Sequence, residues 1–259
     1  MKMVMAPQVA AGSVLHGFIE SLPQRFSEAG TLLYDERNVI REFDIEGQRV
    51  VVKRFRRPNW VQRVAYTYFC KGKARRAYEH GQELLRRGIN TPQPLAYIEL
   101  RSAGLLCDSY YVCGWDGHPP IADLLNRVEE FDRPLARDFA LFAAQLHRLG
   151  ILHHDLNSTN TLYERQDNGS YTFSVIDINR MDFYDSLPPL KECLENITRF
   201  TGNMQLFGYV AWFYADAMAA DFGLERDELQ RMAVERKERH DRRWYRRKRM
   251  LRKLKRLKP

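Results

Sequence analysis

Two polar segments, joined by a short strand pattern, constrain this chain most strongly. The first, residues 153–160, reads HHDLNSTN and follows an apolar helical pattern. The second, residues 174–180, reads SVIDINR and contains the end of a β-branched run over residues 171–176. The sequence Asp-Asn-Gly at 167–169 favours a hairpin turn between them. We therefore predict a helix, a polar loop, a short strand, a turn and a second strand that ends at Asp177.

The spacing within these segments is typical of a kinase active site. Asp155 and Asn160 have the spacing of a catalytic loop in which the Asp receives the substrate hydroxyl and the Asn holds a metal. A second metal-binding Asp normally follows at the end of a buried strand, which is the position of Asp177. Oxygen ligands at Asn160 and Asp177 suit Mg²⁺, which keeps water and substrate phosphates as its other ligands. A zinc site at His153 and His154 is disfavoured because no other His or Cys is spaced to complete it.

The first half of the chain shows the alternation of an antiparallel sheet, after about 30 residues that we interpret as an irregular lead-in. The strand patterns cover residues 31–34, 39–45, 49–55, 95–100 and 105–113. Lys53 lies on the third of them, where a kinase places the Lys that contacts ATP phosphates. A helix is predicted from Ala74 to Gly88, and on it Glu79 is our preferred ion-pair partner for Lys53, with Glu83 as the other register.

Two segments of this half depart from a standard nucleotide site. Residues 35–38, Asp-Glu-Arg-Asn, stand where a nucleotide-covering loop is expected but contain no glycine. The insert from Arg54 to Lys73 mixes basic and aromatic residues, and two interpretations stay open. It forms a surface for an anionic, partly apolar ligand, or it is an amphipathic helix that packs Trp60, Val64 and Tyr68 inward.

We expect an α+β chain with a bilobal, protein-kinase-like fold. A small antiparallel β lobe with one helix covers 1–113, a linker 114–120, and a mainly helical lobe with the catalytic loop 121–238. Helices are predicted at 121–128, 135–149, 191–200, 204–222 and from 225 to about 257. DIN replaces the kinase D-F-G, and A-P-E is absent, which argues against a peptide-binding activation segment.

Charge and cysteines indicate the setting. Net charge is +8, but residues 239–259 hold twelve Lys or Arg and one Asp, so the remainder is about −3. This basic amphipathic tail favours binding to an anionic membrane surface; an RNA-binding arm and a solvated tail are the alternatives, and no nucleic acid is expected. Four scattered cysteines are typical of reduced, mostly buried thiols. Without a signal peptide or a run of about 20 apolar residues, we expect a cytoplasmic protein.

HHDLNSTN together with IDINR resembles the lipopolysaccharide kinase family, the Kdo and heptose (WaaP-type) kinases. Those proteins have a D-L-N-x-x-N catalytic loop and I-D-x-D-R in place of D-F-G. LLRRGINTPQP at 84–94 and Asn196-Ile197 with Arg199-Phe200 resemble two further family motifs. The resemblance covers roughly Val50 to Phe200.

This resemblance implies ATP-dependent phosphorylation of a sugar hydroxyl on the lipopolysaccharide inner core, by a protein peripheral on the inner membrane. It implies the following roles: Asp155 orients the hydroxyl or accepts its proton, Asn160 and Asp177 bind Mg²⁺, Lys53 holds ATP phosphates, Glu79 orients Lys53, and Arg180 steadies Asp177 or the transferred phosphate. His153 braces the loop. Asn179 replaces the second acid of the family motif.

Other functions remain as alternatives. A soluble small-molecule kinase of the aminoglycoside type shares the catalytic loop but often has an acidic cleft, which the basic insert and tail disfavour. A kinase-fold binding protein is the next alternative, and a protein kinase is weakened by the absent activation segment.

Overall fold

The computed structural model describes residues 1–126 and 130–256, and the chain divides into two compact units. The first unit comprises Met1–Gly117 and Val175–Arg180, and the second comprises His118–Ser174 and Met181–Pro259. The linker predicted at 114–120 spans the boundary at Gly117. Residues 175–180, which the sequence analysis assigns to the second lobe, group with the first unit.

Hydrogen bonds explain this grouping. The backbone N–H of Val175 donates to Asn90 O (3.0 Å), and Thr91 Oγ1 donates to Val175 O (2.8 Å). The end of the strand that precedes Asp177 is thereby attached to the segment that follows the helix Lys73–Arg86.

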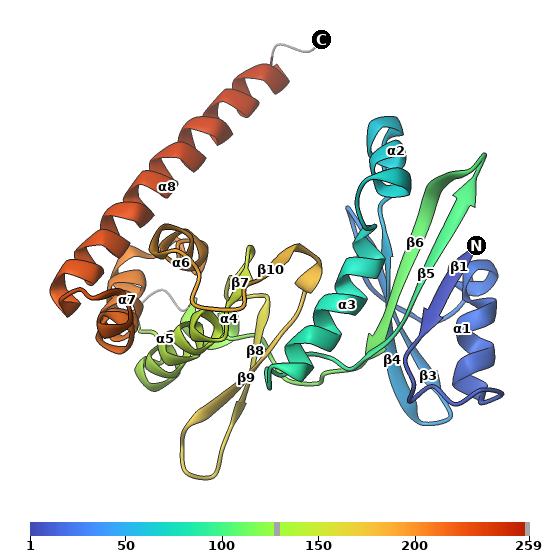
Figure 1. Ribbon diagram of the computed structural model, residues 1–259, viewed down its shortest axis with the longest axis horizontal. Helices are drawn as coiled ribbons and strands as arrows, with labels where there is room; N and C mark the ends of the chain where they lie inside the picture. The colour runs from blue at the N-terminus through green and yellow to red at the C-terminus, as the bar shows by residue number, and fades with distance from the viewer. Residues whose placement is uncertain (127–129, 257–259) are drawn as a thin grey trace. The chain divides into compact units, whose positions relative to one another are not determined.

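Within the described residues, six strands form the antiparallel sheet of the first unit, in the order β1-β5-β6-β4-β3-β2 (Figure 1). The strands are β1 (Lys2–Met5), β2 (Thr31–Asp35), β3 (Val39–Ile45), β4 (Gln48–Phe55), β5 (Pro94–Ser102) and β6 (Leu105–Gly114). The sequence-based strand predictions are confirmed, and β1 is an addition to them.

The interpretation of the first 30 residues as irregular is wrong, because they contain β1 and the helix α1 (Val14–Arg25). Ser13 caps α1 by accepting from the backbone N–H of His16 (3.1 Å). The buried side chains of α1 recur at helical spacing: Leu15, Phe18, Ile19 and Leu22. This periodicity is visible in the sequence and predicts an amphipathic helix.

The two faces of the sheet are covered by different helices, α1 on one and α3 (Lys73–Arg86) on the other (Figure 1). Val50 and Val52 are buried in the core beneath α1. Because successive strand side chains point to opposite faces, Lys53 projects toward the α3 side. There it pairs across the strands with Tyr111 of β6, which in turn pairs with Tyr97 of β5.

The insert contains the short helix α2 (Trp60–Tyr68), which begins with a capping box formed by Asn59 and Gln62. The inward-packing interpretation of this helix is wrong: Trp60 is 66% exposed and Tyr68 is 68% exposed. Polar contacts hold the helix instead, since the Arg63 guanidinium donates to the carbonyl oxygens of Leu106 (2.9 Å) and Ser102 (3.0 Å).

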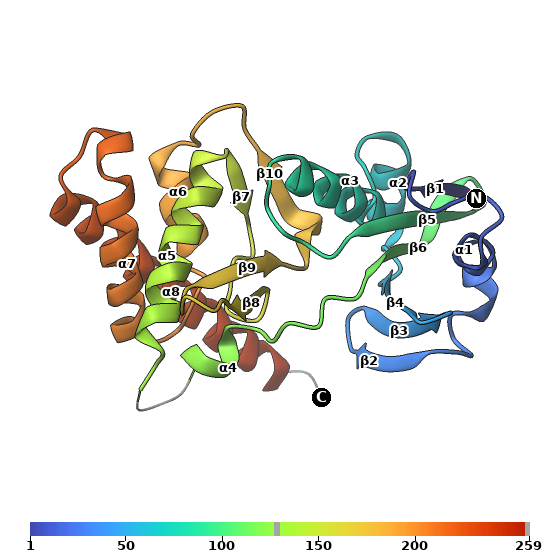
Figure 2. The same ribbon diagram turned by 90° about the horizontal axis from the view of Figure 1, so that it is seen from below.

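The second unit is mainly helical and carries two small β pairs (Figure 2). Its elements are α4 (Ala122–Leu125), α5 (Arg133–Arg148), β7 (Ile151–His153), β8 (Thr161–Arg165), β9 (Tyr171–Val175), β10 (Met181–Phe183), α6 (Leu190–Ile197), α7 (Met204–Met218) and α8 (Arg226–Arg256). The helix predictions at 135–149, 191–200, 204–222 and from 225 are confirmed to within a few residues at their ends. The helix predicted at 121–128 is formed over Ala122–Leu125, and Arg127 and Val128 lie outside the described residues. The predicted turn at 167–169 is formed, with Gly169 at φ +84°.

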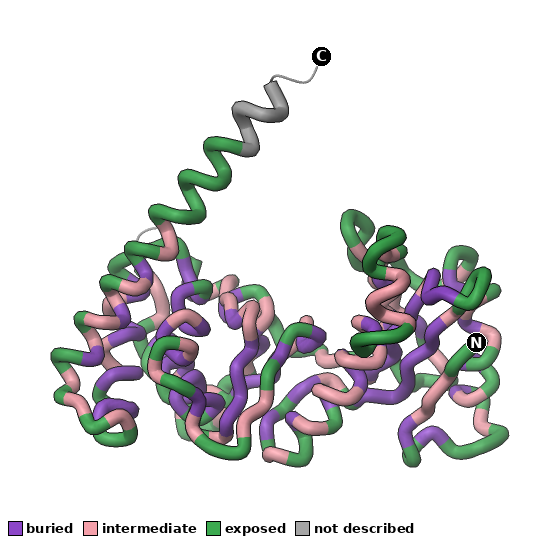
Figure 3. Tube along the Cα trace, turned by 45° about the horizontal axis from the view of Figure 1, so that its top comes forward, coloured by how far each residue is buried: buried purple, intermediate pink, exposed green. Residues whose placement is uncertain are grey.

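The long helix α8 changes character along its length (Figure 3). Leu229, Ala233 and Lys237, spaced four residues apart, are buried against the other helices. From Arg242 to Met250 the helix is exposed. The predicted basic tail is thus the outer part of α8, and its last residues, 257–259, lie outside the described part of the chain.

Two remaining expectations concern cysteines and membrane spans. Cys107, Cys113 and Cys193 are buried free thiols and Cys70 is exposed, as predicted for mostly buried reduced cysteines. Over the described ranges, no helix has the length and apolarity needed to cross a bilayer.

Candidate active site

The first unit brings together Lys53 and Asp177, two of the predicted site residues. Lys53 Nζ lies 2.5 Å from Asp177 Oδ1, and the lysine side chain is largely buried. Asp177 has φ +56°, a left-handed backbone that an L-residue adopts at a cost of roughly 1 kcal/mol. Such conformations are concentrated at functional sites, because surrounding contacts must hold them in place.

Asn179 is the contact that the sequence analysis missed. Its buried side chain donates through Nδ2 to Asp177 Oδ1 (2.7 Å). The short 3-10 turn that carries it, Ile178–Arg180, is tied to α3 by His80 Nδ1 at 2.7 Å from Ile178 O. Replacement of the second acid by Asn therefore supplies a hydrogen-bond donor that fixes the direction of the Asp177 carboxylate.

The predicted ion pair between Lys53 and Glu79 is not formed in the described structure. Glu79 binds Lys71 (2.8 Å) and Arg75 (2.8 Å), and these contacts outweigh burial, so the pKa of Glu79 is lowered. The other register fails too, because Glu83 binds two neighbouring arginines, Arg86 and Arg87, on its own helix turn. Both carboxylates form ion pairs with cations close to them in sequence, and Lys53 forms its ion pair with Asp177 instead.

A cluster of positive charge surrounds the Lys53 ion pair. Burial lowers the pKa of Lys73, and nearby positive charges lower it further, those of Arg37, Arg180, Arg76 and Lys53. Arg37 comes from the glycine-free β2–β3 turn and Lys73 from the first turn of α3. The sequence analysis missed both, although a basic residue in that turn is a visible signal. Arg180 belongs to this cluster, and the structure describes no contact between it and Asp177.

The second unit holds the other predicted pair, Asp155 and Asn160, on the loop that follows β7. Asn160 Nδ2 donates to the backbone oxygen of Asp155 (3.0 Å), which directs the amide nitrogen inward and keeps the amide oxygen for another partner. Asn157 Oδ1 accepts from the backbone N–H groups of Thr159 (3.0 Å) and Asn160 (2.9 Å). The Asn of the D-L-N sequence therefore shapes the loop as an Asx turn.

Two side chains contact Asp155, one at the end of β7 and one in the segment after α6. The buried His153 accepts through Nδ1 from the Asp155 backbone N–H (3.3 Å), as expected for a residue that braces the loop. Arg199, which the sequence analysis used only as a motif residue, lies with NH1 3.7 Å from Asp155 Oδ1. The guanidinium therefore places a positive charge next to the Asp155 carboxylate.

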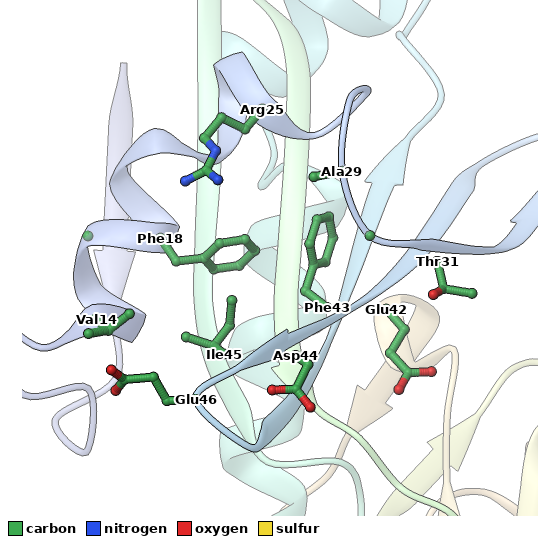
Figure 4. A pocket seen from close by; sticks show the side chains of 12 residues that line it. Val14, Phe18, Arg25, Ala29, Thr31, Glu42, Phe43, Asp44, Ile45 and Glu46 are labelled. Carbon is green, nitrogen blue, oxygen red and sulfur yellow. The ribbon is translucent and has the colours of Figure 1, made fainter.

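A hollow of about 640 Å³ lies between α1 and β3 in the first unit, away from Lys53 and Asp177 (Figure 4). Its floor is apolar, with the Phe18 and Phe43 rings 5.0 Å apart. Of its carboxylates, Glu42 pairs with Arg49, and Asp44 accepts from the backbone N–H of Gly47 (2.7 Å). Glu42 and Asp44 are therefore engaged in contacts within the fold.

The chain is similar to known proteins in sequence and in fold. The model of the lipopolysaccharide kinase (Kdo/WaaP) family matches residues 37–186, which is more than half of the chain. No curated protein matches it. A solved structure described as "WaaP in complex with acyl carrier protein" matches with a TM-score of 0.58 and 16% identity, over 91% of this chain and 99% of that chain. At this identity the likeness concerns the fold, and it confirms the predicted kinase-like α+β class.

Proposed function

The chain belongs to the lipopolysaccharide kinase (Kdo/WaaP) family, and on that premise we propose that it transfers the γ-phosphate of ATP to a sugar hydroxyl of the lipopolysaccharide inner core. The acceptor sugar is Kdo or heptose. The observation that carries the proposal is the Lys53–Asp177 pair, a strand lysine held at 2.5 Å from a carboxylate at the end of another strand. In phosphoryl transfer such groups serve the phosphates and the metal, respectively.

The oxygen donors of Asp177 and Asn160 fit a Mg²⁺ ion, which takes one or two protein oxygens and fills its other positions with water and phosphate. Asn179 orients the Asp177 carboxylate, and the Asn160 amide nitrogen donates to Asp155 O, so the amide oxygen of Asn160 can serve as a ligand. When bound, the metal neutralises negative charge on the phosphates.

The chain's own residues divide the remaining work. Lys53, assisted by the positive charge of Arg37 and Lys73, holds the phosphate oxygens. Asp155 accepts the proton of the sugar hydroxyl as the bond to phosphorus forms, and Arg199 contacts this carboxylate and helps to position it.

Transfer of labelled γ-phosphate from Mg-ATP to Kdo-lipid A and to purified inner-core lipopolysaccharide tests the proposal. We expect transfer by the wild type and loss of at least about 10²-fold in Asp155→Asn. Asp167→Asn, in the exposed β8–β9 turn, is the matched control and should keep full transfer. ATP binding without transfer to either glycolipid would contradict the proposed acceptor, and failure to bind ATP would contradict a kinase altogether.

We also propose that the protein is cytoplasmic and binds the inner membrane surface through the outer part of α8. The exposed stretch carries six Lys or Arg among residues 242–249 together with Trp244 and Tyr245, a composition suited to anionic lipid. Flotation with anionic liposomes should weaken on deletion of 239–259 while ATP binding stays. Equal flotation of both forms would argue against this role.

A further inference from the structure

A cavity of about 680 Å³ lies in the second unit, and Asp155 is one of its lining residues. This volume is typical of pockets that bind small molecules. The remaining walls come from the end of α6 with the segment after it and from the middle and outer parts of α8. The walls include Glu195, Arg199, Asp241, Arg243, Trp244 and Arg247.

Each carboxylate in this lining already has a cation. Asp155 has Arg199 at 3.7 Å, and Asp241 has Lys237 at 2.7 Å. Glu195 has Arg236, from outside the lining, at 2.6 Å. The negative charges of the cavity are therefore compensated within the protein.

Two guanidinium groups of the lining are not compensated in this way. Arg243 donates through Nε to the backbone oxygen of Arg239 (3.2 Å), which leaves its positive charge unneutralised. For Arg243 and Arg247 alike, no carboxylate of the described residues lies within ion-pair distance. Guanidinium groups bind carboxylate and phosphate in a bidentate manner, so this wall is suited to an anion.

Trp244 lies between these arginines and is 48% exposed. Its ring contacts Tyr245 at 4.9 Å between centroids and carries the Lys248 ammonium 4.4 Å from its own centroid. A half-exposed indole offers a flat apolar surface on which the C–H face of a sugar ring can pack, while its neighbours bind charge.

We propose that this cavity is the acceptor site and that it selects an anionic sugar. Arg243 and Arg247 hold the carboxylate or phosphate of the sugar, Trp244 packs against its ring, and the hydroxyl to be phosphorylated meets Asp155 in the same cavity. This inference rests on the proposed function, and it deepens it by naming the residues that choose the acceptor.

The test uses a deacylated, Kdo-containing inner-core oligosaccharide, which is free of membrane, with the full-length protein. Binding is measured by calorimetry without nucleotide, and phosphate transfer is measured separately. We expect Arg243→Glu/Arg247→Glu to raise the Kd and the acceptor KM at least 10-fold while leaving the KM for ATP unchanged. Trp244→Ala should raise the same constants by a smaller factor.

Arg246→Glu/Arg249→Glu is the matched control, because it makes the same change of charge on the same helix outside the cavity lining. We expect it to change the acceptor constants less than threefold. Equal weakening by both double variants would show diffuse attraction by the tail and overturn the proposal, as would unchanged acceptor binding in Arg243→Glu/Arg247→Glu.

The anionic group is identified by reducing the sugar carboxylates, or by removing the phosphates, in separate samples. The modification that removes the bound anion should weaken binding to the wild type and leave the cavity variant unaffected. If neither modification weakens wild-type binding, the arginines do not hold an anion. Oligosaccharide binding at the cavity without phosphate transfer would count against the proposed function alone.

Discussion

Lys53 Nζ and Asp177 Oδ1 are 2.5 Å apart although the two residues are separated by 124 positions in the chain. The ion pair connects the central strand β4 with the turn after β9. In the proposed reaction, each partner has a second task, on the phosphates and on the metal. Substrate binding therefore exchanges this internal contact for contacts with Mg-ATP.

Lys53→Met removes the ammonium group and keeps much of the apolar stem. We expect kcat to fall about 10²–10³-fold, as on loss of one charged group that stabilises a transition state. Lys71→Met, which alters a lysine bound to Glu79, serves as the control and should retain near wild-type kcat. Equal activity of both variants would remove Lys53 from the reaction.

Asn179→Ala removes the donor that orients the Asp177 carboxylate. Residues that orient a metal ligand typically contribute 10–100-fold to metal affinity. We expect the Mg²⁺ concentration at half-maximal activity to rise about 10-fold, with little change in the acceptor KM, in a titration of initial rates. An unchanged Mg²⁺ dependence would mean that Asn179 only packs in the fold.

Glu79→Gln tests the correction to the predicted ion pair. Since Glu79 binds Lys71 and Arg75, we expect activity to fall less than about threefold and stability by at most about 1 kcal/mol. Steady-state kinetics and urea unfolding measure the two effects. A 100-fold loss of kcat with normal stability would instead indicate that Glu79 moves to Lys53 during turnover.

We expect His147 to make the stability of the second unit depend on pH. It is fully buried between α5, α6 and α7: Nδ1 accepts from Tyr214 OH (2.8 Å), and Nε2 donates to Asn196 Oδ1 (3.1 Å). Burial lowers the pKa of His147 to about 4. Below about pH 6.5 the ring is protonated in the unfolded chain but stays neutral in the folded chain. The contribution of His147 to the free energy of unfolding is therefore complete above pH 6.5 and is lost as the pH falls toward 4.

The expected loss from this group is roughly 2–3 kcal/mol between pH 7.5 and 4.5. His147→Gln lacks the titrating ring, so its urea-unfolding free energy should depend less on pH and approach the wild-type value as the pH is lowered. Parallel pH curves for the two proteins would contradict this assignment.

The strands and turns around residues 153–177 were predicted correctly because they depend on local signals. The Asp155–Asn160 spacing, the turn at 167–169 and the alternation before Asp177 need no knowledge of distant residues. The partner of Lys53 could not be predicted in the same way. It depends on which carboxylate lies nearest to Lys53 after folding. Arg75, four residues before Glu79 on the same helix face, indicated a local ion pair for Glu79, but the prediction followed the kinase pattern instead.

Burial was also beyond what local patterns could decide. The apolar stripe of α2 has the spacing of a packed helix, yet Trp60 and Tyr68 are exposed, and Arg63 holds the helix through backbone carbonyl oxygens. Conversely, the helical spacing of Leu15, Phe18 and Leu22 was sufficient to predict α1. The prediction of an irregular lead-in did not use it. The lining of the Asp155 cavity by α8 joins residues some 90 positions apart, which no motif contains.

Repulsion between like charges destabilises the outer part of α8 as a helix. Arg242 and Arg246, and Arg243 and Arg247, lie four positions apart, where like charges repel. Nearby acidic residues offset little of this, with Glu238 at 3.4 Å from Arg242 as one example. Beyond Asp241 the helix–coil balance is therefore set by the ionic strength and by any polyanion at hand. We therefore expect the helix content of this segment to rise with ionic strength and on contact with an anionic surface or ligand.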